Sequence, residues 1–154
     1  MDAVKTLYRR LRSEYGAELI EMAIVAPLLM MLLAAMFDFG FAFRNWEVVT
    51  NAAREGARIG VLPGYNCSPG AGVAGDVEAR VQDYMTGAGF PNTSDYTIEV
   101  GTTTVGSFTS CVVRVSMFQQ LSSLGVIAQF FGGNFTSIPL VAAAVMRTEV
   151  QAGP

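Results

Sequence analysis

Two acidic side chains, Glu18 and Glu21, stand at the start of the longest apolar run in the sequence. An ionised carboxylate is costly to move into a lipid bilayer, so a carboxylate at such a boundary needs a partner or a compensating role. In the simpler interpretation both side chains lie at the membrane interface, where the positive N-terminal end of a helix favours them. The alternative is that Glu21 has a specific partner. Whether such a partner exists depends on the segment that precedes Glu21.

Two cysteines, Cys67 and Cys111, lie beyond the apolar run. In an exported domain an oxidising compartment allows two thiols to pair, and we expect this disulfide. It would close a loop of roughly 45 residues, for which the chain-entropy estimate is about 4 kcal/mol. Two unpaired buried cysteines are the alternative. A zinc site is not expected because the sequence has no histidine.

The same lack of histidine removes the usual general base, and no serine or cysteine stands beside an evident activating lysine. We therefore expect no enzyme, no cofactor and no small-molecule substrate. Without the four basic and two acidic residues of positions 1–16, six basic and eleven acidic residues remain, a net charge of −5. That balance disfavours nucleic acid as a partner.

The apolar run, Met22 to Phe43, has one charge, Asp38, and is long enough for a helix to cross a hydrocarbon layer of roughly 30 Å. We place the transmembrane part at about 19–43. Lys5, Arg9, Arg10 and Arg12 precede it, so the flanking charge bias predicts a cytoplasmic N-terminus and an exported C-terminal part. Because no A-x-A site follows the run, we expect a retained anchor and not a removed secretory signal.

The run continues without a strong break, except Pro27, to about Leu62, which predicts one long helix over about 17–62. Pro63 and Gly64 end it. In its second half Ala52, Gly56 and Gly60 recur every fourth residue, so another backbone can approach closely. Its nearest partner is the chain's own C-terminal domain. Trp46, Val49, Ala53 and Ala57 share one face at helical spacing.

Residues 63–154 read as a small exported domain. Asp76 to Met85 predicts a short helix, with Asp76 able to cap its start and an apolar face of Val77, Val81 and Tyr84 or Met85. Alternating patterns predict strands around 96–101, 113–117 and 138–150, in an antiparallel sheet. The apolar stretch 121–135 fits a short helix over the sheet or a hydrophobic loop for a partner. The predicted class is α+β.

A basic leader that ends in Gly16, then four residues, then Glu21 and an apolar helix resembles the processing site of type IV pilins and pseudopilins. The resemblance implies cleavage between Gly16 and Ala17 by a membrane aspartyl peptidase, and a pilin-like fold. It also implies that Glu21 pairs with the new amine of a neighbouring subunit and sets the register of the filament. The chain is then a leader (1–16), a long helix (17–62) and an exported domain (63–154).

Further motifs narrow the resemblance to the TadE-like family, the minor pilins or pseudopilins of the tight-adherence (Flp) pilus. They are Pro27 after an alanine, the triplet Asp38-Phe39-Gly40, the stretch from Asn51 to Arg58, and the C-terminal segment from Ala144 to Glu149. Methionine and not an aromatic residue follows Glu21, which departs from the major Flp pilin.

Several polar and small residues of the helix are candidate contacts with other subunits. Asp38 either reaches the headgroup region or pairs with a basic residue of another subunit. The second alternative arises because the nearest basic residue of the same chain, Arg44, is six positions away and lies on another face of the helix. The cluster of Arg54, Glu55 and Arg58 either forms a solvated helix edge that braces its own domain or contacts another subunit. The close-approach positions Ala52, Gly56 and Gly60 are candidates of the same kind.

The resemblance implies assembly of a surface-adhesion pilus, with other pilin subunits, the pilus assembly platform, a prepilin peptidase and membrane lipid as partners. The expected location is the bacterial inner membrane, single-pass, with a periplasmic C-terminal domain, or a filament outside the cell. The alternative is an uncleaved single-pass protein whose outer domain is a binding module or scaffold of an envelope complex.

Overall fold

A computed structural model describes residues 14–65, 67, 74–106, 108–130, 132–133 and 137–147. Two predicted features lie partly outside these residues: the leader, of which the basic part is not described, and the third predicted strand, whose end with Glu149 is not described. Contacts divide the chain into two compact units. The first comprises Met1–Phe39 with Ser122–Phe135, and the second comprises Gly40–Leu121 with Thr136–Pro154.

The elements follow the order α2 (Glu14–Gly60), α3 (Ala74–Gly87), β1 (Tyr96–Val105), β2 (Phe108–Gln120), α4 (Ser122–Phe130) and β3 (Ser137–Arg147). A long apolar helix packs on a small domain with a short helix and a three-stranded antiparallel sheet, so the predicted α+β class is confirmed.

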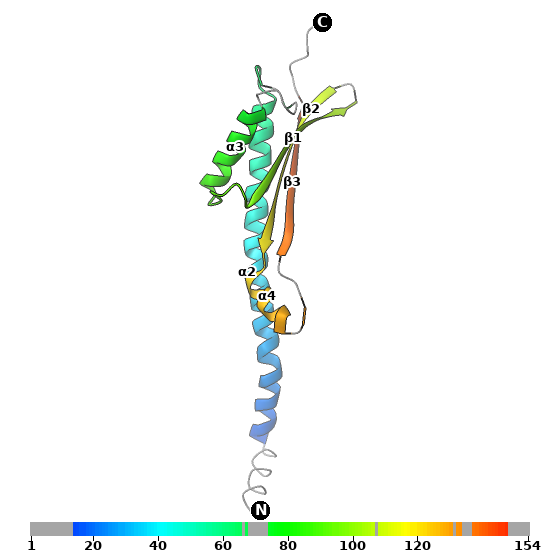
Figure 1. The fold of residues 1–154 in the computed structure, drawn as a ribbon. Coiled ribbons are helices and arrows are strands. Elements are labelled where there is room, and N and C mark those ends of the chain that lie inside the picture. The colour runs from blue at the N-terminus through cyan, green and yellow to red at the C-terminus, as the bar shows by residue number, and fades with distance from the viewer. Residues whose placement is uncertain are drawn as a thin grey trace, which may run out of the picture. The chain divides into compact units, whose positions relative to one another are not determined.

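The sheet of the second unit has the strand order β1-β2-β3, with β2 in the centre (Figure 1). Glu99 pairs with Arg114 between β1 and β2, and Val113 pairs with Ala144 between β2 and β3. Burial alternates along β3, over Cys111–Met117 of β2 and over Tyr96–Val100 of β1, as a sheet with one covered face requires. Its buried face includes Val113, Val115 and Ala142, whereas Val141 and Val145 of β3 are about half exposed on the other face.

In the second unit, the C-terminal half of α2 and the helix α3 share one core with this buried face of the sheet. The core joins the three elements: Val49, Ala52, Ala53 and Ala57 from α2, Val77, Val81 and Met85 from α3, and the inward side chains of the strands. The predicted face of α2 is confirmed at Val49, Ala53 and Ala57. Trp46 differs, because it is 44% exposed.

The observed ends of the helices α2 and α3 differ from the predicted ends by a few residues. Helix α2 ends at Gly60, two residues before the predicted end, and turns follow in which the amides of Leu62 and Tyr65 donate to carbonyls three residues back. Gly64 has a φ of +90°, which glycine adopts without strain. Helix α3 begins two residues before Asp76, so Asp76 lies in its first turn. Met85, and not Tyr84, completes the buried face of α3.

The apolar stretch 121–135, for which the sequence left two alternatives, contains the helix α4. The helix of the first alternative is thus present, but it is grouped with the N-terminal part of α2 and not with the sheet. Contacts with residues 24–38 of α2 place α4 in this unit. A local sequence pattern cannot predict such contacts between distant segments.

Candidate functional site

The predicted processing site lies in the first turns of α2. Gly16 is half-buried, and Ala17 and Glu21 are exposed. The two exposed residues are four positions apart, so they lie about one helical turn from each other on the same side of the helix. Among the described residues Glu21 has no hydrogen bond or ion pair. Its carboxylate is therefore available to a group outside the part of the chain that the structure describes.

The following stretch of α2 exposes almost every large apolar side chain. Leu29, Leu33 and Phe37 are more than half exposed, as are Leu19, Ile20, Met22, Ile24, Leu28, Met30, Met36, Phe39, Phe41 and Phe43. Within the described residues, Gly16–Gly60 is long and apolar enough to cross a membrane by length and composition. Pro27 is accommodated inside the helix. So much apolar surface requires a cover, and a bilayer supplies one.

Asp38 is the charged residue inside this apolar run, and it is buried, with 5% of its surface exposed. Its carboxylate accepts hydrogen bonds from the backbone amide of Ser123, at 3.1 and 3.3 Å, and from that of Leu124, at 2.7 Å. These amides belong to the first turn of α4, where a helix has no internal acceptors for its N–H groups. Asp38 thus caps a helix that lies far away in the sequence.

This cap was not anticipated from the sequence, which offered the headgroup region or another subunit as the environment of Asp38. The intrachain hydrogen bonds account for a carboxylate at this position without a second subunit. A signal was present: Ser122 and Ser123 precede an apolar run, as at many helix starts. Nothing in the local sequence linked that start to Asp38.

The small residues Ala52, Gly56 and Gly60 are buried, and the chain's own domain fills the space beside them. A Cβ built on Gly56 would lie 2.5 Å from Cγ2 of Val81 in α3, closer than real carbon atoms approach. A Cβ on Gly60 would overlap the Sγ of Cys67 and lie 2.6 Å from the Sγ of Cys111. The close approach that the spacing predicted is therefore made by α3 and by the two cysteines.

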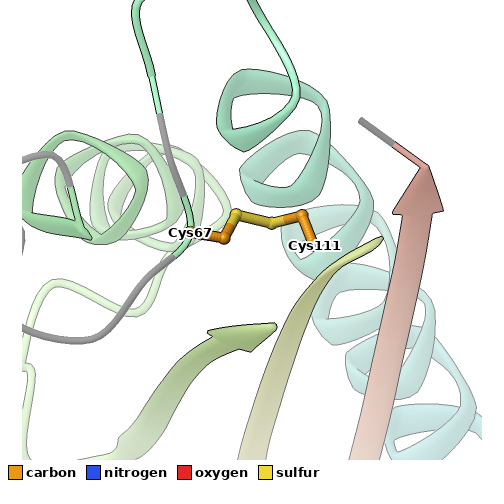
Figure 2. The surroundings of a disulfide bond; sticks show 2 residues. All are labelled: Cys67 and Cys111. Atoms are coloured by element: carbon orange, nitrogen blue, oxygen red, sulfur yellow. A yellow bond between two sulfur atoms is a disulfide. The ribbon is translucent and has the colours of Figure 1, made fainter. Parts of the chain in front are cut away.

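Cys67 and Cys111 form a disulfide, with their Cα atoms 5.4 Å apart, and both side chains are buried (Figure 2). The bond joins the segment after α2 to β2 of the central sheet, and it packs on the last turn of α2 at Gly60. The predicted pairing is confirmed. In the structure this bond ties together three parts of the second unit.

The charged edge of α2 is also occupied within the chain. Glu55 accepts hydrogen bonds from Arg80 of α3, the shorter at 2.8 Å, and from Arg58 at 3.1 Å. These bonds lower the pKa of the Glu55 carboxyl below its usual value, Arg80 having the larger effect. Arg54 is exposed and has no ion pair among the described residues. Of the predicted cluster, Arg58 thus braces its own domain, through Glu55.

A second polar contact joins α2 to β2. The side-chain amide of Asn45 donates a hydrogen bond to the side-chain oxygen of Gln119. The side-chain oxygen of Asn45, Oδ1, is buried and has no partner among the described residues, and neither does the hydroxyl of Tyr96. Burial raises the pKa of Tyr96, with a smaller effect from the neighbouring Asp95. The sequence analysis named neither Asn45 nor Tyr96 as a candidate functional residue.

Comparison with known families gives one match, which covers most of α2. The family model of the TadE-like protein matches residues 16–58. Neither the curated proteins nor the solved structures give a match. The segment from Gly16 to Arg58 is thus similar to TadE-like proteins over this part of the chain. It contains Ala17, Glu21, Asp38 and the close-approach positions up to Gly56, whereas the resemblance noted at the C-terminus lies outside it.

Proposed function

We propose that the chain is a minor pilin or pseudopilin that takes part in assembling a tight-adherence pilus for surface attachment. The observation that carries the proposal is the TadE-like match over residues 16–58, which begins at Gly16. In this function the long helix crosses the inner membrane with its N-terminus in the cytoplasm. A prepilin peptidase then cuts between Gly16 and Ala17.

The arrangement at the start of α2 supports this mechanism. Cleavage would give Ala17 a positive amine, and Glu21 presents a carboxylate one turn further along the same exposed side. Within one subunit no described group pairs with that carboxylate. In a low-dielectric membrane a pair between the amine of one subunit and the carboxylate of the next would offset the cost of placing each charge there.

The exposed apolar residues of α2 support the remaining step. In the membrane lipid covers them, and in a filament the same side chains pack against helices of other pilin subunits. Association within a bilayer depends on packing and on polar contacts, because lipid is as apolar as the helix surface. A single specific ion pair can therefore determine the register between subunits.

The cleavage is tested by coexpression with the prepilin peptidase of a tight-adherence system. Mass spectrometry should find a chain that begins at Ala17. The variant Gly16→Ile should keep its leader, because the peptidase site needs a small residue before the cut. An intact N-terminus beside an active peptidase would overturn the proposal and favour an uncleaved single-pass scaffold protein.

The role of Glu21 is tested separately from cleavage. The variant Glu21→Ala should be processed and yet fail to support piliation, which electron microscopy of the cell surface measures. Glu18→Ala is the matched control, because Glu18 is also exposed and lies in the same helix. Normal piliation by Glu21→Ala, or an equal loss in both variants, would remove the specific role of Glu21.

A further inference from the structure

Helix α4 lies beside the apolar run of α2, within the first unit. Val126 and Ile127 of α4 line a groove of about 570 Å³ together with residues of α2, namely Ile24, Pro27, Leu28, Met30 and Met31. At its N-terminal end α4 is capped by Asp38. The helix therefore runs alongside residues 24–38 of α2, the same residues that we assign to the membrane span.

The composition of α4 fits a membrane environment. Its sequence, SSLGVIAQF, has no charged residue. Gly125 is buried, whereas Val126 is 70% exposed. An isolated valine on a water-exposed helix would need no explanation, but this one lines a groove whose other walls are apolar side chains of the span.

Backbone hydrogen bonding fits the same environment. Inside a bilayer every backbone N–H needs a partner within the protein, and the first turn of a helix leaves several without one. The carboxylate of Asp38 supplies acceptors to Ser123 and Leu124. Conversely, the N-terminal end of α4 offers donors and a positive potential to a carboxylate that would otherwise be unpaired inside the span. Each group offsets the cost of burying the other.

The depth follows from the helix rise. Asp38 lies five residues inside the C-terminal end of the apolar run at Phe43, about 7 to 8 Å along the axis. Met30 and Met31, which share the groove with Val126, lie roughly another 10 Å deeper. A bilayer that covers the run from Met22 to Phe43 must therefore also cover α4.

We propose that α4 is a second membrane-embedded element of this protein, and that lipid acyl chains cover Val126 and fill the groove between α4 and α2. This proposal depends on the proposed function in one respect, because it requires that the α2 span be inserted. It adds to that function a second helix, which lies in the half of the bilayer that surrounds the C-terminal half of the α2 span. Asp38 holds this helix there.

The test uses spin labels on single cysteines of the full-length chain, because Cys67 and Cys111 are paired and leave no free thiol among the described residues. Val126→Cys probes α4. Leu33→Cys, which is exposed on the span, and Val145→Cys, which is exposed on β3, are the controls. Each labelled protein is reconstituted into vesicles of phosphatidylcholine and phosphatidylglycerol. Electron paramagnetic resonance then measures collisions with oxygen, which partitions into lipid, and with a water-soluble nickel chelate.

We expect the labels at Val126 and Leu33 to collide mainly with oxygen and to lose broadening by nickel, and the label at Val145 to show the reverse. If Leu33 is in lipid and Val126 behaves like Val145, the membrane-embedded α4 is excluded and the proposed function stands. If Leu33 itself is exposed to nickel, the span is not inserted, and both proposals fail. A label at Val126 that is shielded from both reagents and shows dipolar broadening at high protein density would identify a second copy, and not lipid, as the cover.

A label-free measurement guards against disturbance by the probe. Hydrogen exchange of the wild-type chain in the same vesicles should leave the amides of Leu124 to Gln129 protected. In Asp38→Val, which removes the acceptors, that protection should be lost while residues 24–36 stay protected. Rapid exchange of α4 in the wild-type chain in vesicles would overturn the proposal.

Discussion

The carboxylate of Asp38 and the backbone amide of Leu124 are 2.7 Å apart, although 86 positions separate the two residues in the sequence. This hydrogen bond, with those to Ser123, fixes the start of α4 against the first unit's segment of α2. A capping residue normally belongs to the chain segment just before the helix. Here a residue of another helix performs that function, so the cap of α4 depends on a side chain that is distant in the sequence.

Replacing Asp38 by alanine should therefore loosen α4. Loss of a capping side chain typically costs about 1 kcal/mol, and the partly buried amides of Ser123 and Leu124 would lose their side-chain acceptor. Hydrogen exchange in detergent micelles should be faster at Ser123 and Leu124 than in the wild-type chain. Asp38→Asn is the matched control, because it keeps one oxygen acceptor and should have a smaller effect. Equal exchange in all three proteins would contradict the capping role.

Much of the fold could be predicted from local patterns. The apolar run predicted the long helix, and the alternation at Tyr96, Ile98 and Val100 predicted β1, because period and burial are properties of neighbouring residues. The pairing of Asp38 with α4 could not be predicted in this way. It depends on which distant segments meet, and SSLGVIAQF fits equally well with several partners.

For the candidate site, too, local features could be predicted from the sequence and contacts between distant segments could not. The spacing of Ala52, Gly56 and Gly60 predicted that a neighbour approaches α2 closely, because the absence of large side chains is visible in the sequence. It did not say which neighbour. The structure shows that Val81 and the disulfide occupy this face, so these positions serve the second unit and are not open to another subunit.

The contact at Gly60 predicts a large effect of a single methyl group. In Gly60→Ala the new Cβ would overlap the disulfide, and overpacking of this kind typically costs about 1 to 3 kcal/mol. The melting temperature of the chain in detergent should fall. Gly40→Ala is the control, because a Cβ there meets nothing within 4 Å, and alanine favours a helix by about 1 kcal/mol over glycine. A fall of similar size in both variants would contradict the steric explanation.

Removing the disulfide should destabilise the second unit. The cysteines are 44 positions apart, and a loop of this size corresponds to roughly 4 kcal/mol in the chain-entropy estimate. The double variant Cys67→Ala/Cys111→Ala should therefore unfold at a lower denaturant concentration than the wild-type chain. Wild-type protein treated with a reductant should move in the same direction. An unchanged midpoint in both cases would show that packing alone holds this region.

The last two substitutions should also be coupled. Without the two sulfur atoms, the Cβ of Gly60→Ala no longer meets them, so the cost of this change should be smaller in the double-alanine background than in the wild-type chain. A double-mutant cycle measures the difference as an interaction free energy, which residues in direct contact typically show at about 0.5 to 3 kcal/mol. Strict additivity would mean that Gly60 is required for another reason.

Glu55 should make the stability of the second unit sensitive to acid. Its pKa in the folded state lies below the ordinary glutamate value of 4.5, because the ionised carboxylate accepts hydrogen bonds from Arg80, which has the larger effect, and from Arg58. A lowered folded pKa means that the stabilisation is fully present above about pH 4.5 and is lost as the pH falls through the folded value. Since both arginines are about half exposed or more, the contribution should be only about 0.5 to 1 kcal/mol.

The variant Glu55→Gln tests this relation by denaturant unfolding at several pH values. The wild-type chain should be more stable than the variant at pH 7, and the difference should shrink as the pH falls below about 4.5. Glu47→Gln is the control, because Glu47 is exposed on the same helix and has no ion pair among the described residues, so its effect should be small. High salt should also reduce the Glu55 difference, because both arginines reach solvent. A difference that persists unchanged at low pH would mean that the charge of Glu55 is not what stabilises the contact between α2 and α3.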